Sequence, residues 1–169
     1  ASDETLKNPH FKITSGLGAD QVTWFQNVAQ KINRVSPGMK YTFGFHMQPE
    51  MFRVALSQYG TVNADTINNP INIDTHPNKK ETDFGYIGRD LKNNLDTNYS
   101  IYNSMKALGC DSILAGHEHC NSASVVYDGV RFQYGQKSST YDRANYMKDD
   151  GTIVGASYGA TTGKAMIGG

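Results

Sequence analysis

The sequence has no long hydrophobic run and no excess of either charge. None of its apolar stretches approaches the roughly 20 residues that a transmembrane helix needs, so we expect no membrane-spanning segment. Its 16 basic and 16 acidic side chains give a formal net charge of zero. A chain without net charge has no overall electric field that would attract nucleic acid or an anionic membrane. These two absences argue against membrane-embedded and polyanion-binding classes of protein.

Several familiar catalytic patterns are also missing. The sequence has no helical His-Glu-x-x-His zinc-protease motif and no Gly-x-Ser-x-Gly nucleophile elbow. A cupin site needs a glutamate shortly after its His-x-His pair, and residues 120–127 contain none. Cysteine is scarce, and Cys110 and Cys120 bracket a predicted strand that is too long for a disulfide to span if it is straight. We therefore expect free thiols, which say little about the compartment.

What the sequence does have is the mixture of helical and extended patterns that is typical of an α/β or α+β domain. Its 169 residues can bury a core, and its 17 glycines suit a fold rich in loops. Helices are predicted over 20–36, 49–60 and 98–108, one strand over 40–46, another ending at Ala115, and a hairpin over 124–134 around Asp128-Gly129. Trp24 and Phe25 lie in the apolar stripe of the first helix, so both are expected in the core. Residues 61–90 show no clear period and are predicted to be a loop.

The most informative segment reads Gly-His-Glu-His and follows the strand that ends at Ala115. If the extended backbone continues, His117 and His119 project from the same face, because side chains alternate along a strand. Neutral imidazole is a common ligand of zinc, iron and similar ions. The simpler interpretation is that the two histidines are polar residues of a surface loop.

A second strand-like segment ends in a histidine, His46. Ligand sites of α/β sheets lie at the carboxyl ends of the strands, so three histidines are predicted to meet at one edge. Such a set would suffice for one catalytic zinc ion, or would make half of a two-metal centre. Asp74 and His76 in the loop are further possible ligands, although loop residues of these types are more often solvated.

These motifs resemble the calcineurin-like metallophosphoesterases, in particular the branch related to purple acid phosphatases. That branch has a Gly-His-Asp-His-x-Asn segment, a Tyr-Asp-Gly hairpin and a Tyr-Gly step, and residues 116–121, 127–129 and 134–135 are similar to them. The family's Gln-x-x-Trp helix and its Phe-x-His strand before a Pro/Glu helix start are similar to residues 21–24 and 43–50. The likeness runs in order from residue 21 to about residue 141.

The resemblance implies that residues 1–169 are one partial domain, the C-terminal half of a two-sheet β-sandwich flanked by helices. His46 and His117 would then bind one metal ion and His119 the other, and Asn121 would lie on the substrate side of the site. The family uses two transition-metal ions, such as iron, zinc or manganese. With the ions ~3.5–4 Å apart, a metal-activated hydroxide attacks a phosphate ester.

The family's Asp-x-His, Gly-Asp and Gly-Asn-His motifs, which supply the bridging carboxylates, are not in this sequence. The resemblance therefore implies that the N-terminal half comes from the rest of the same enzyme or from a partner chain. Glu118 replaces the commoner aspartate and is expected to face away from the metals. Half a sandwich is also expected to expose a large apolar face, which favours pairing with the other half or homo-oligomerisation.

Two other functions remain open at this point. The chain could be a non-catalytic fragment or a degenerate relative that acts as a binding or assembly module. A stand-alone zinc hydrolase with three histidine ligands is a weaker alternative, because the sequence offers it no convincing general base.

Overall fold

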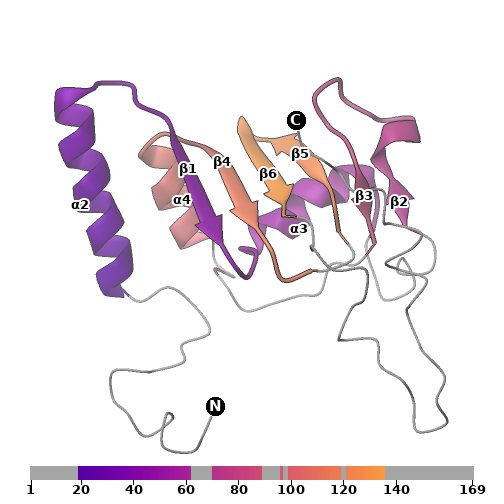
Figure 1. The fold of residues 1–169 in the computed structure, drawn as a ribbon, viewed down its shortest axis with the longest axis horizontal. Helices are drawn as coiled ribbons and strands as arrows, with labels where there is room; N and C mark the ends of the chain where they lie inside the picture. The colour runs from indigo at the N-terminus through magenta and orange to yellow at the C-terminus, as the bar shows by residue number, and fades with distance from the viewer. Residues whose placement is uncertain (1–18, 62–69, 89–95, 97–98, 119–120, 136–169) are drawn as a thin grey trace, which may run out of the picture.

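The computed structural model describes residues 19–61, 70–88, 96, 99–118 and 121–135. At the centre of this part lies a four-stranded sheet with the strand order β1-β4-β6-β5 (Figure 1). The strands are β1 (Tyr41–Phe45), β4 (Cys110–Ala115), β5 (Ser124–Tyr127) and β6 (Val130–Tyr134). β4 runs parallel to both β1 and β6, whereas β5 is antiparallel to β6. The class is mixed α/β, as predicted.

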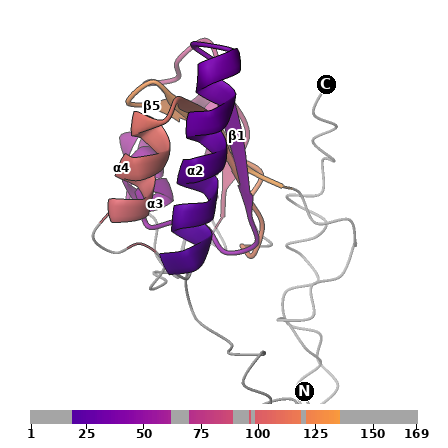
Figure 2. The same ribbon diagram turned by 90° about the vertical axis from the view of Figure 1, so that its left-hand side faces the viewer.

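Helices cover one face of this sheet in the described part of the chain (Figure 2). They are α2 (Ala19–Val35), α3 (Met51–Leu56) and α4 (Ser100–Ala107), and a 3-10 turn, η1 (Ser57–Tyr59), continues α3. The predicted helices are therefore confirmed within a few residues at their ends. Because β1 and β4 are parallel neighbours, their carboxyl ends lie at the same edge of the sheet.

The core lies between the helices and the covered face of the sheet. Phe52 of α3 is fully buried and packs against Phe132 and Tyr134, with ring centroids 5.2 and 4.9 Å away. Tilted and edge-on aromatic pairs of this kind add to the free energy of burial. On α2, Phe25 packs edge-on against Phe43 at 5.3 Å. Along β6, alternate residues are buried in this core, as the period of two predicts: Val130, Phe132 and Tyr134.

The predicted hairpin is confirmed. Its turn is Asp128-Gly129, and both residues have positive φ, +50° and +74°. This is the geometry of the two-residue turn that matches the twist of the flanking strands, and it favours Asp-Gly for that reason. β5 and β6 pair from Tyr127 with Val130 to Ser124 with Gln133.

The prediction of a loop over residues 61–90 is wrong in part. Within its described residues, a small antiparallel sheet pairs β2 (Ile71–Asn72) with β3 (Tyr86–Ile87), and a 3-10 turn, η3 (Ile73–Thr75), follows β2. Strands of two residues are too short to give a readable period. What anchors this segment is tertiary: Ile73 and Ile87 are fully buried.

The prediction that Trp24 belongs to the core is wrong. Its side chain is 67% exposed, whereas Phe25 and Ala29 are buried. α2 lies at one side of the helical layer (Figure 2), so only a narrow stripe of its surface meets the sheet. Trp24 belongs to the flank of the helix, one residue away from that stripe.

The second face of the sheet carries small and polar side chains in the described part. Thr42 and Ser112 pair across β1 and β4 and share a hydrogen bond of 2.8 Å between their hydroxyls. Gln133 pairs with Leu114, which is 42% exposed and is the one large exposed hydrophobic residue among the described strands. The expectation of a large exposed apolar face is therefore wrong for this part of the chain. No helix among the described residues is long and apolar enough to cross a membrane.

Candidate metal centre

The two histidines His46 and His117 lie side by side at the carboxyl edge of the sheet. Phe45 and Ala115, the last residues of β1 and β4, are register partners. Just beyond them, the backbone N–H of Gly116 donates to the carbonyl oxygen of His46 at 3.0 Å. The two imidazole rings have centroids 5.5 Å apart and an interplanar angle of 82°. Parallel pairing of β1 with β4 thus brings together two residues that are distant in the sequence.

The backbone at His117 differs from the extended geometry that we predicted. β4 ends at Ala115, and His117 has a φ of +68°. The N–H of Glu118 donates to the carbonyl oxygen of Gly116 at 2.8 Å, which closes a three-residue turn with His117 at its centre. A turn of this kind with positive φ is rare and strained in a residue other than glycine. Alternation along a strand therefore cannot relate His117 to His119.

The distance between the rings of His46 and His117 fits two ligands of one ion. A nitrogen–zinc distance of about 2.1 Å places the ion about 3.2 Å from each ring centre, so rings at a tetrahedral angle have centres about 5.2 Å apart. The observed separation is 5.5 Å. Both side chains are exposed, so an ion can reach them.

The described residues do not complete a metal site by themselves. No group of three or more His, Cys, Asp or Glu within them could hold an ion. The third predicted ligand, His119, lies outside the described residues, as does its neighbour Cys120. A third ligand of these four residue types would come from outside this described part.

Asn121, predicted to lie on the substrate side, is buried with 2% of its surface exposed. Its Oδ1 accepts a hydrogen bond of 2.9 Å from the N–H of Gly88, and its own N–H donates to the carbonyl oxygen of Glu118 at 3.2 Å. The N–H of the next residue, Ser122, donates to the carbonyl oxygen of Tyr86. Asn121 thus ties the histidine loop to the end of β3.

Three buried polar atoms in the segments that follow β1 and β4 were not predicted from the sequence. Glu50 Oε2, Glu118 Oε1 and Ser122 Oγ are buried and have no hydrogen-bond partner among the described residues. Buried polar groups are normally paired, so each such atom calls for an explanation. The only hint of these atoms in the sequence was that Glu50 follows His46 closely and that Ser122 directly follows Asn121.

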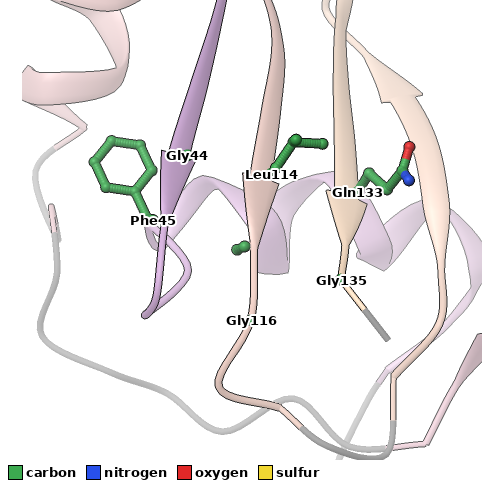
Figure 3. Close-up of a pocket in the computed structure, with 7 residues that line it drawn as sticks. Gly44, Phe45, Leu114, Gly116, Gln133 and Gly135 are labelled. Carbon is green, nitrogen blue, oxygen red and sulfur yellow. The ribbon is translucent and has the colours of Figure 1, made fainter. Parts of the chain in front are cut away.

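A hollow of about 460 Å³ opens on the second face of the sheet, and its lining includes Phe45 and Gly116, the residues directly before His46 and His117 (Figure 3). Its lining comes from the ends of β1, β4 and β6: Gly44, Phe45, Leu114, Ala115, Gly116, Gln133 and Gly135. A Cβ added at Gly44 would meet nothing within 4 Å, and one at Gly135 would meet nothing closer than 3.6 Å. The chain's own packing therefore does not require glycine at these two positions. Glycine inside a strand often marks the close approach of a ligand or of another backbone.

The other possible ligands, Asp74 and His76, have structural partners elsewhere. The ring of His76 packs edge-on against Tyr59 at 5.2 Å, and its Nδ1 accepts a hydrogen bond from the N–H of Asn78. Asp74 forms an ion pair with Lys79 at 3.7 Å. These contacts hold the loop between β2 and β3 in place.

Cys110 is a free, buried thiol, as predicted. Burial is the main cause that raises its pKa from 9.0 to about 11. A thiol that stays protonated near neutral pH is a poor nucleophile and a poor metal ligand. It takes part in the packing of β4 and not in the histidine site.

Comparison of the chain with protein-family models, with curated proteins and with solved structures gave no match. The likeness to metallophosphoesterases therefore rests on the motifs between residues 21 and 141 alone.

Proposed function

We propose that this chain supplies the histidine half of a metal-dependent phosphoesterase. The observation that carries the proposal is the pairing of His46 and His117 at the ends of two adjacent parallel strands, with ring centroids 5.5 Å apart. The strained backbone of His117 adds support, because conformations of this kind cluster at functional sites.

In this proposal His46 and His117 hold one of two transition-metal ions, and His119 holds the other. When bound, the metal pair supplies a hydroxide near neutral pH and stabilises the attacking and leaving oxygens of a phosphate ester. The described residues of the chain orient the ligands: the Gly116–His46 backbone bond fixes the two loops against each other. Asn121 holds the histidine loop against Gly88.

We further propose that a second layer of protein covers the open face of the sheet. Sheets with parallel strands are usually covered on both faces, and the hollow beside Gly44 and Gly135 leaves room for a close approach. We infer that the N-terminal half of the enzyme, with its carboxylate ligands, covers this face and completes a two-sheet sandwich. That half is part of the same enzyme or a partner chain.

The first experiment measures metal binding by the 169-residue chain. Titration with Zn²⁺ or Mn²⁺ should show binding that His46→Ala and His117→Ala each weaken at least about tenfold, because each removes a ligand. His76→Ala is the matched control, since it removes a histidine that packs on Tyr59. Binding that is equal in all variants would contradict the proposed site.

A second experiment tests catalysis in the protein as it is isolated from its source. Metal analysis and intact mass should show about two metal ions together with a larger or second polypeptide. His117→Ala in that material should abolish hydrolysis of a chromogenic phosphate ester. Unchanged turnover would rule out this site as the centre of the reaction.

A second candidate, a non-catalytic binding or assembly module, is favoured by the exposure of Trp24 at 67%. Exposed tryptophan is enriched among the residues that dominate protein interfaces. A module of this kind would bind a partner through α2 and would need no metal. Metal-independent association that Trp24→Ala abolishes, together with an absence of metal binding, would favour it.

A further inference from the structure

We propose that Glu118 is a charge-balancing residue of the histidine site, whose buried carboxylate stabilises a bound divalent cation through space without coordinating it. The proposal rests on the metal site proposed above. It also changes what the sequence suggested for Glu118, which was expected to face away from the metals and to matter little.

The side chain of Glu118 is buried. It is 5% exposed, and its Oε1 is buried without a hydrogen-bond partner among the described residues. In contrast, Oε1 of the partly buried Glu50 lies 3.5 Å from the guanidinium Nε of Arg53. Glu118 has no such ion pair within the described part of the chain. A buried carboxylate without compensation is costly, so a cation from outside this set of residues is the natural partner.

Backbone hydrogen bonds hold Glu118 at the end of the turn around His117. Its N–H donates to Gly116 at 2.8 Å, and its carbonyl oxygen accepts from Asn121 at 3.2 Å. Asn121 is in turn bonded to Gly88. These bonds hold the backbone of Glu118 directly after the turn at His117, and the side chain that it carries is buried. The buried carboxylate therefore belongs to the residue that directly follows His117.

A charge-balancing role and a purely structural role of Glu118 predict different effects on stability and on metal affinity. In the absence of metal, an uncompensated buried charge destabilises the fold. In its presence, the same charge raises affinity, because a cation in a poorly solvated site is strongly attracted. Removing the charge should therefore stabilise the metal-free chain and weaken metal binding. Loss of a merely structural contact would lower the stability.

The test uses Glu118→Gln in the full 169-residue chain, with Zn²⁺ as the probe. We expect Zn²⁺ affinity to fall about 10–100-fold, the usual effect of removing a group that supports metal ligands. The urea midpoint of the chain in excess chelator should rise or stay the same. Glu118→Asp keeps the charge and should retain most of the affinity. Asp111→Asn neutralises an exposed carboxylate of β4 and should change neither quantity.

The outcomes separate this proposal from the proposed function. If His46→Ala and His117→Ala weaken Zn²⁺ binding but Glu118→Gln binds as the wild type does, the role of Glu118 is overturned and the metal site stands. A Glu118→Gln chain that is less stable than the wild type without metal, or that does not fold, also overturns it. If the wild type binds no Zn²⁺, the proposed metal site itself is wrong.

Discussion

Replacing His117 with glycine should raise the stability of the metal-free chain relative to alanine at the same position, although both changes remove a predicted ligand. His117 has a φ of +68° and lies at the centre of a turn closed by the Glu118–Gly116 hydrogen bond. Glycine adopts positive φ without steric cost, whereas alanine keeps the strain.

The expected difference follows from two opposing contributions. A residue held in a sparsely populated backbone region costs on the order of 1–3 kcal/mol. Glycine makes the unfolded chain more flexible, which offsets about 0.5–1 kcal/mol of that gain. His117→Gly should therefore be about 1 kcal/mol more stable than His117→Ala, within a range of about 0–2.5 kcal/mol. Both variants lose the edge-on contact with His46, so that contribution cancels in the comparison.

The assay is urea denaturation in excess chelator, with the free energy of unfolding extrapolated to water. Leu114 gives a matched control, because it is exposed, lies in β4 and has no positive φ. There Leu114→Gly should be about 0.5–1 kcal/mol less stable than Leu114→Ala. The sign of the glycine–alanine difference should thus reverse between the two positions.

A free energy of unfolding of His117→Gly that is no higher than that of His117→Ala would refute this prediction. The strained turn would then be absent in solution, and the link from strain to function at His117 would fail with it. Zn²⁺ binding by the same variants gives a second measurement. If His117→Gly proves the more stable variant but has lost affinity, the imidazole at this position contributes to metal binding at a cost in stability.

Four further perturbations test other parts of the fold. Asp83→Ala should cost about 2–4 kcal/mol in urea denaturation, because its buried carboxylate accepts hydrogen bonds from the Tyr59 hydroxyl at 2.6 Å and from a β5 N–H at 2.9 Å. Burial, and then the bond to Asp83, raise the pKa of Tyr59 from 10.0 to about 12. The unfolded phenol ionises first, so stability should fall between pH 10 and 12 in the wild type, and this contribution should be absent in Tyr59→Phe. Gly109→Ala should cost at least about 2 kcal/mol in the same assay, because φ is +102° and a Cβ would lie 2.9 Å from the carbonyl oxygen of Met39. Asp96→Ala should lower the free energy of unfolding by about 1–2 kcal/mol, since it removes the carboxylate that accepts hydrogen bonds from the N–H groups of Ile101 and Tyr102 in the first turn of α4.

Much of the fold follows from local patterns in the sequence. The helical stripes predicted α2, α3 and α4, and the Asp128-Gly129 dipeptide predicted the hairpin turn. Each of these features depends on a window of a few residues, where propensity and turn chemistry dominate. The histidines at the ends of the strands were visible for the same reason.

The errors came from features that depend on distant contacts. Trp24 has the spacing of a core residue, but the position of α2 at the side of the layer leaves it exposed. The short strands β2 and β3 exist because Ile73 and Ile87 are buried by other segments. The φ of His117 depends on the pairing of Gly116 with the end of β1, which no local window contains.

By itself the sequence determined the elements, the hairpin, and which chemical groups stand at the ends of two strands. Only the tertiary structure decided that His46 and His117 are neighbours, that the backbone turns at His117, and that the side chain of Glu118 is buried. The physical reason is that hydrophobic period and turn preference act over a few residues. Proximity and burial, by contrast, arise from sheet pairing and packing between segments that are far apart in the chain.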